Sequence, residues 1–379
     1  MLNLNNLPDI QFVETDPEKI IQEIITGYED AYFQQTGKRK KLYPGDPIRI
    51  FLYSQALREV QLRQLIDFSA KQNLLKYAKG DYLLHYGASK SVEKLEAQRA
   101  TAKVKFRLST ALTSVYTIPV GLRVGPGNDI HFETTEPIEI PAGQQEVITT
   151  VRCTVEGIIG NDFTPGQINI ISDPRPYLIS VENIETSNGG SDEEDDESYR
   201  ERINLAPEGY STAGPEGAYI YHLKSFSPLI GDVYPHSPSD GIVDIRILLK
   251  GGELPSQTFI DEAIAYVSAK DKRPLTDKVQ MGAPTTEIYN IDFDYYISSS
   301  EAPSVDVIQQ KVQKAIDDYK TWQNSKIGRD IDPSELIARI RDAGGKRIKV
   351  RSPIFTELAK TQSAVTGTVQ AIYGGLVDD

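Results

Sequence analysis

The sequence predicts an α+β multidomain protein: N-terminal long helices, an antiparallel β domain, and C-terminal α/β open-faced sandwich modules. Apolar residues recur at helical spacing in the first quarter, alternate in short runs in the second, and then switch between the two periods. A chain of 379 residues is long enough to bury more than one core. We expect domains at residues 1–100, 101–186, 187–284 and 285–379.

Two long helices are expected near the N-terminus. Asp16 and Pro17 form a helix start, and a second helix opens at Pro47 with no internal proline or glycine until Gly80, a rod of roughly 45 Å. Both helices carry apolar residues that need cover, either from an intrachain hairpin or from a bundle with other chains. Both alternatives remain open. The residues expected to contact a partner are Ile20, Ile24, Tyr28, Tyr32, Ile48, Phe51, Leu62 and Ile66.

The second region reads as a small antiparallel sandwich or barrel. Val104, Phe106 and Leu108 alternate with polar residues, and further short apolar runs lie at 138–140, 147–155 and 168–171. Glycine and proline turns separate these runs, as they do in β sandwiches and barrels.

An acidic run, Asp192 to Glu197, opens the third region. It lacks the glycine and the alternating oxygen ligands of a calcium loop. Ser191 and Glu194 instead have the spacing of a capping box, so we predict a helix that starts here and continues through Ile203.

The last third repeats a strand followed by a helix. We expect a second short helix from Gly214, strands at 242–249 and 291–297, and helices at 256–270 and from Ser304. Asp332 to Glu335 is a further helix start, Gly344 and Gly345 are a stop, and Ile348 and Val350 lie in a closing strand. This order predicts one or two open-faced α/β sandwiches.

Composition excludes several classes of function. A net charge of −13 opposes binding to nucleic acid or anionic lipid, and no apolar window approaches the ~18 residues of a membrane span. The N-terminus lacks the pattern of a Sec-type signal, so we expect a soluble chain. A single cysteine, Cys153, excludes intrachain disulfides and thiolate clusters. We therefore expect neither a nucleic-acid nor a membrane partner.

The sequence also lacks the signatures of common active sites. Serine-hydrolase, zinc-protease and nucleotide-binding motifs are absent, and the four histidines share no ligand spacing. We expect no catalytic residue, no cofactor and no metal site, although a glycosidase needs only two carboxylates, so an enzyme is not excluded. Tyrosine, at 20 residues, outnumbers phenylalanine, at 11. This bias fits either subunit interfaces or a surface of no special purpose.

Several motifs in order along the chain carry a family resemblance. They are Ala78–Leu83, Ala100–Leu108, Ile118–Gly121, Phe132–Thr134, Ile140–Gly143, Gly157–Asn161, Pro165–Ile168, Asn183–Arg202, Ser211–Pro215, Gly241–Val243 and Arg273–Asp277. Together the sequence resembles the baseplate J-like family, the wedge proteins of contractile phage tails and of phage-tail-like bacteriocins.

The resemblance implies a structural baseplate wedge subunit of a contractile injection system. Two copies would pair with a smaller wedge protein, and adjacent wedges would join in a six-fold ring around the spike hub, next to the sheath initiator. The ring would reorganise to trigger sheath contraction. N-terminal helices of relatives enter a bundle, and C-terminal parts make contacts between copies. The implied location is the virion or bacteriocin particle, assembled in the bacterial host cytoplasm.

The implied switching needs a movable element. Gly189 and Gly190 are our predicted hinge. The alternative functions are a tail-associated cell-wall hydrolase and a receptor-binding tip protein. Tip proteins are commonly fibrous with long β-repeats, and no internal repeat occurs here.

Overall fold

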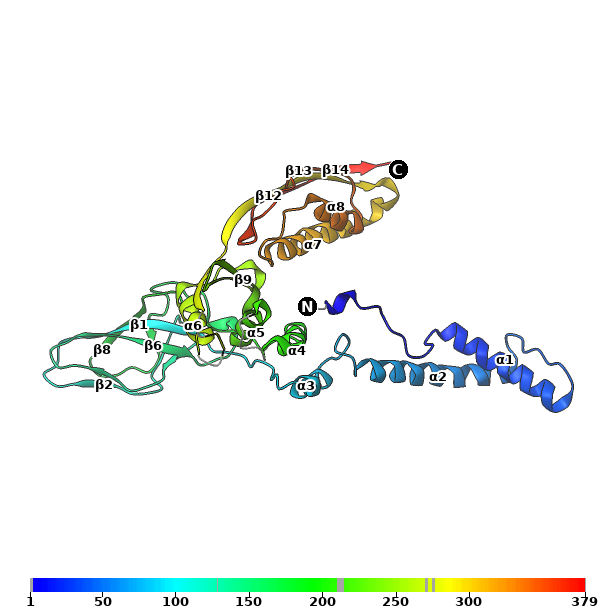
Figure 1. The fold of residues 1–379 in the computed structure, drawn as a ribbon, viewed down its shortest axis with the longest axis horizontal. Coiled ribbons are helices and arrows are strands. Elements are labelled where there is room, and N and C mark those ends of the chain that lie inside the picture. Colours follow the sequence, from blue (N-terminus) through cyan, green and yellow to red (C-terminus); the bar gives the residue numbers. More distant parts are fainter. Residues whose placement is uncertain (1–2, 128, 210–214, 270–271, 275–276, 379) are drawn as a thin grey trace. The chain divides into compact units, whose positions relative to one another are not determined.

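The computed structural model describes residues 3–127, 129–209, 215–269, 272–274 and 277–378. The chain divides into two compact units, one of residues 1–94 with 195–205 and one of residues 95–194 with 206–379. Helices dominate the first unit, whereas sheets and helices alternate in the second (Figure 1). The predicted α+β multidomain class is therefore confirmed.

The first unit contains α1 (Pro17–Thr36), α2 (Pro47–Lys71), α3 (Asp81–Ala88), the start of α4 (Asp196–Gly209) and a short 3-10 turn, η1 (Leu4–Asn6). Asp16 and Asp46 cap α1 and α2, because each carboxylate accepts a hydrogen bond from the N–H two residues later. The expected helix from Pro47 to Gly80 is wrong in length. α2 ends at Lys71, about 37 Å from its start, and the Gln72 side chain accepts a hydrogen bond from the Lys79 N–H across the turn that follows.

The β domain opens the second unit. Its strands are β1 (Thr101–Leu108), β2 (Tyr116–Ile118), β3 (Arg123–Gly125), β4 (Phe132–Thr134), β5 (Ile138–Ile140), β6 (Glu146–Cys153), β7 (Ile170–Ile171) and β8 (Leu178–Asn183), with the 3-10 turn η2 (Ile158–Gly160). Six of them form an antiparallel sheet in the order β7-β3-β4-β6-β1-β8, and β2 pairs with β5. The two edge strands, β7 and β8, contact each other, so the sheet curls toward a barrel. The predicted alternation holds, since Val104, Phe106 and Leu108 are all buried.

A central module follows. Its elements are α5 (Glu216–Phe226), β9 (Ile230–Ser239), β10 (Ile242–Leu249), η3 (Lys250–Gly252), α6 (Gln257–Val267) and β11 (Lys278–Gly282). The sheet order is β11-β10-β9, and α5 and α6 pack on it around Ile245 and Ile247. β10 was predicted with its bounds, but β9 and β11 were missed.

The C-terminal module is an open-faced sandwich. Its elements are β12 (Thr285–Ser298), η4 (Ser299–Ser304), α7 (Val305–Asn324), α8 (Pro333–Asp342), β13 (Lys346–Ser352) and β14 (Gln362–Val377). The sheet order is β13-β12-β14, with α7 and α8 on one face (Figure 1). The expected closing strand is β13, but a further strand, β14, follows it along the chain and pairs with β12.

The predicted capping box is wrong. The backbone of Ser191 pairs with Gln98 in a β-bridge, so Ser191 cannot begin a helix. α4 starts at Asp196, and Asp195 caps it by accepting from the Ser198 N–H. Glu194 is buried and accepts from the Leu95 N–H. The motif at 211–214, the helix start at Gly214, residue 270 of the expected helix and residues 275–276 of the last motif lie outside the described residues.

Candidate interaction surface

α1 and α2 pack against each other as a hairpin (Figure 1). Ile20 and Ile25 of α1 and Ala56 and Val60 of α2 are buried, and Leu42 closes the connecting turn. The Leu42 N–H donates to the Glu29 carboxylate at 2.6 Å. The hairpin alternative left open by the sequence is therefore formed.

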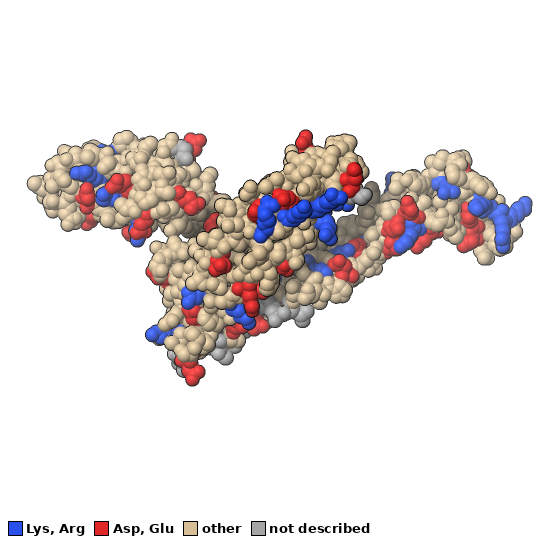
Figure 2. Space-filling view, turned by 90° about the horizontal axis from the view of Figure 1, so that it is seen from above, with Lys and Arg blue, Asp and Glu red and all other residues tan. Residues whose placement is uncertain are grey.

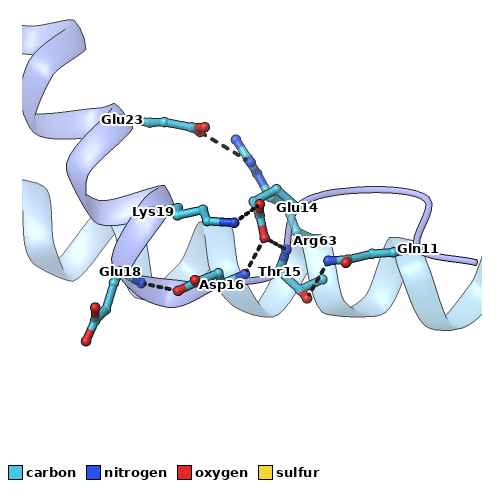
Figure 3. A network of polar contacts seen from close by, with 8 residues as sticks. All are labelled: Gln11, Glu14, Thr15, Asp16, Glu18, Lys19, Glu23 and Arg63. Carbon is cyan, nitrogen blue, oxygen red and sulfur yellow. Dashed lines mark hydrogen bonds and ion pairs between the residues drawn. The ribbon is translucent and has the colours of Figure 1, made fainter.

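A polar network surrounds the start of α1, and one ion pair connects α1 to α2 (Figure 3). The Glu14 carboxylate accepts from Lys19 Nζ at 2.9 Å and from the N–H groups of Thr15 and Asp16. The Lys19 hydrogen bond lowers the pKa of Glu14 below its usual range. Arg63 of α2 bonds Glu23 of α1 at 3.4 Å. Of these contacts, the Arg63–Glu23 pair is the one that joins α1 to α2, and an exposed ion pair of this kind contributes little to stability.

α2 keeps a large apolar surface that α1 does not cover. At 100° per residue, Leu57 and Phe68 lie on one side of the helix, and Leu62 and Ile66 lie on a different side. One neighbouring helix cannot cover both sides, so burial of this surface needs a multi-helix bundle. We call it the α2 face. Its members and exposed fractions are Ile50 61%, Phe51 61%, Tyr53 49%, Leu57 45%, Leu62 58%, Leu65 59%, Ile66 52% and Phe68 47%.

The structure divides the eight residues that the sequence predicted as partner contacts. Phe51, Leu62 and Ile66 are exposed and belong to the α2 face. Ile24, Tyr28, Tyr32 and Ile48 are half-buried. Ile20 is fully buried inside the hairpin, so a partner cannot reach it in this conformation. The sequence missed five members, Ile50, Tyr53, Leu57, Leu65 and Phe68, because a helix that is apolar on several sides does not reveal which side its neighbour covers.

A run of four basic residues, Lys38 to Lys41, forms the tip of the hairpin between α1 and α2. Figure 2 shows basic side chains gathered at this end. Arg39 lies 5.7 Å from the centre of the Phe33 ring and Lys40 lies 5.8 Å from that of Tyr32. In the described part of the chain, no ion pair joins this basic tip to a carboxylate. It can therefore attract an acidic partner segment next to the α2 face.

The predicted hinge lies inside the β domain. The Gly190 N–H donates to the Asn161 side chain at 2.8 Å, and the Asn161 amide donates back to the Gly190 carbonyl at 2.8 Å. Asn188 and Ser191, on either side of the glycine pair, form β-bridges with Thr101 and Gln98. A hinge at Gly189 and Gly190 would have to break these bonds, so these contacts disfavour it.

The side chains that could act as a nucleophile or as metal ligands do not form a site in the described residues. Cys153 is fully buried in the β core. Within residues 3–378, leaving aside the undescribed gaps, no three histidine, cysteine or carboxylate side chains are placed to hold a metal ion. The helices that the structure describes include none with the length and apolar content to cross a bilayer.

Four domain profiles of one family match the chain in order. They are the baseplate J-like N-terminal domain at residues 45–101, the barrel domain at 103–190, the central domain at 211–283 and the C-terminal domain at 289–372. The baseplate protein J of Escherichia phage P2 is 29% identical over 184 residues, which are 48% of this chain and 60% of the P2 protein. The chain thus spans less than two thirds of that relative.

A chain in the cryo-EM structure of the anti-feeding prophage baseplate, six-fold symmetrised, is also similar. It has 13% identity and a TM-score of 0.45, with 94% of this chain and 100% of that chain covered. The barrel, central and C-terminal matches fall on the curled sheet and on the two open-faced modules described above. On the four domain matches, the chain belongs to the baseplate J-like family.

Proposed function

We propose that this chain is a structural baseplate wedge subunit of a contractile injection system. Family membership supports a structural component of a contractile-tail baseplate. The α2 face supports the finer proposal, since its eight exposed apolar side chains need a multi-helix bundle that the described part of one chain does not supply.

The bundle would contain the hairpins of two copies and helices of a smaller wedge protein. Adjacent wedges would then form a six-fold ring around the spike hub, with the sheath initiator above it, and rearrangement of the ring would trigger sheath contraction. The basic tip at Lys38 to Lys41 supports an acidic segment in one of these partners. The particle would assemble in the bacterial host cytoplasm, whether it is a phage or a bacteriocin.

A non-enzymatic role agrees with the family and with the absence of catalytic signatures in the sequence. A tail-associated cell-wall hydrolase is the competing function. The purified chain should leave a peptidoglycan zymogram uncleared, and clearing by the chain alone would favour the hydrolase.

The decisive experiment co-expresses the chain with its neighbouring tail proteins. Leu62→Ser with Leu65→Ser should abolish co-purification with the smaller wedge protein. The free energy of unfolding should change by less than about 0.5 kcal/mol per site, because both side chains are exposed. Ile148→Ser is the matched control, because Ile148 is 58% exposed on β6 and belongs to the other compact unit of the chain. Normal assembly of the double variant would contradict the proposal.

A further inference from the structure

β14 is an unusual edge strand. It runs for 16 residues, from Gln362 to Val377, and contains no charged residue and no proline. Long uncharged edges are rare in monomeric proteins, because their free N–H and C=O groups pair with other strands. β14 therefore has the composition of a strand that is covered by another strand.

Its surroundings leave one edge free. β12 pairs with β14 along its whole length, in parallel. On the opposite side, Ser363 forms a bridge with Ile327, and Gly328 donates to the Gln362 carbonyl. After Ser363, no second strand borders β14 in the described part of the chain. Three large apolar side chains are exposed along the free stretch: Val369 41%, Ile372 41% and Leu376 48%.

The other edge of the same sheet is protected. β13 has seven residues, and four of them are basic: Lys346, Arg347, Lys349 and Arg351. Short length and positive charge are two devices that prevent edge-to-edge pairing. The sheet thus protects one edge and leaves the longer edge without charge.

Two bulges define which part of β14 can pair regularly. The register with β12 shifts between Tyr289 and Ile291 and again between Tyr295 and Ile297. Between the shifts, Ile291 to Tyr295 pairs with Val369 to Tyr373 without interruption. The regular free edge is therefore the five residues from Val369 to Tyr373, with Ala371 at its centre.

We propose that β14 pairs with β14 of a second copy of this chain, antiparallel and about a two-fold axis at Ala371. An uncharged strand is self-complementary, because no like charges meet when it pairs with itself. The two three-stranded sheets would then form one continuous sheet. Pairing of β13 with β13 would instead bring basic side chains together. This inference rests on the proposed function, because it identifies one contact between copies.

Cysteine cross-linking tests the register. Ala371→Cys should form a disulfide-linked dimer of the full chain under mild oxidation, because directly opposed residues of antiparallel strands have Cα atoms about 4.5–5.5 Å apart, a separation that a disulfide spans. Lys349→Cys on the β13 edge is the control and should stay monomeric. The native Cys153 is buried and should not contribute. Failure of Ala371→Cys to cross-link, or mixed dimers between the two variants, would overturn the inference.

Sedimentation equilibrium of the full chain tests the same β14 contact without introducing a disulfide, because it measures the dimer dissociation constant. Ile372→Lys should raise the dimer dissociation constant at least tenfold, because like charges would meet beside the axis. Ile288→Lys carries the same change at a residue 69% exposed on β12 and should leave the constant unchanged. A monomeric wild-type chain, or equal effects of both variants, would contradict the pairing. An Ile372→Lys chain that still joins the helical bundle would separate this inference from the proposed function.

Discussion

Arg123 and Asp173 form the best-connected ion pair of the β domain. The guanidinium contacts both carboxylate oxygens, at 2.9 and 3.1 Å, and the Arg123 N–H donates to the same carboxylate at 3.0 Å. The hydrogen bond from the Arg123 side chain is the largest cause that lowers the pKa of Asp173, to about 2. The charged carboxylate therefore stabilises the folded β domain.

Asp173→Asn should remove part of the acid sensitivity of the protein. The folded-state pKa lies below the unfolded value of about 3.9, so this stabilisation is present above pH 4 and is lost as pH falls toward 2. Acid unfolding followed by circular dichroism should show that the stability of the variant falls less steeply than that of the wild type between about pH 4 and pH 2. Asp129→Asn, at an exposed carboxylate of the same domain, is the control. Equal curves for wild type and Asp173→Asn would contradict the assignment.

Gly190 is a close-packed glycine. A Cβ atom there would lie 2.4 Å from the Gly157 carbonyl oxygen and 3.1 Å from the Ala100 Cβ, both parts of the β domain. Gly190→Ala should lower the free energy of unfolding by about 1–3 kcal/mol, the usual cost of overpacking. Urea denaturation measures the loss. If Gly190 were a free hinge, alanine would be accommodated with little change in stability.

At the scale of elements, the helices are set by short-range signals. Aspartate caps, proline at the first turn and Gly37 after α1 define where α1 and α2 begin and where α1 ends. Within α1, however, Gly27 lowers the stability of the helix, because glycine loses more backbone freedom than alanine when it becomes helical. The hairpin is therefore held by contacts rather than by propensity alone.

Gly27→Ala should stabilise the hairpin by about 0.5–1 kcal/mol, because a Cβ there meets no atom within 4 Å and the backbone is already helical. Gly37→Ala is the matched contrast. It has the same open space but a φ of +68°, so alanine should destabilise by about 1 kcal/mol. Thermal unfolding of both variants tests the pair, and shifts of the same sign would contradict it.

At the scale of the whole molecule, charge opposes association between copies. The net charge of −13 repels identical chains, whereas the proposed β14 contact contains no charge. Added salt screens the repulsion, since the Debye length falls from about 30 Å at 0.01 M to about 10 Å at 0.1 M.

Self-association of the purified chain should therefore strengthen as salt rises. Sedimentation equilibrium at low and moderate ionic strength measures the dissociation constant, which should fall. Weaker association at higher salt would instead indicate an interface built on ion pairs, for example with the basic tip. Charge reversal at Lys40 and Lys41 would then identify that interface.

Apolar residues that repeat every second position, or every third to fourth position, were enough to predict most of the strands and helices. The alternation through Ile291, Phe293 and Tyr295 and the stripe through Ile308, Val312 and Ile316 specify the faces that become the C-terminal core. Strand β9 escaped prediction, because Pro235 and its serines break the alternation. The acidic run was misread, because Ser191 satisfies the local capping pattern and its pairing with Gln98 is long-range.

The fold class, the helix starts, the absence of familiar catalytic motifs and the family resemblance could all be predicted from the amino-acid sequence, because each depends on residues close together in the chain. Three properties are seen only in the folded chain: which side of α2 is covered by α1, that Ile20 is internal while Leu65 is exposed, and that β14 is an edge. Those properties depend on which distant segments pack together. An apolar residue that is buried and one that stays exposed can be of the same type, so the sequence alone does not distinguish them.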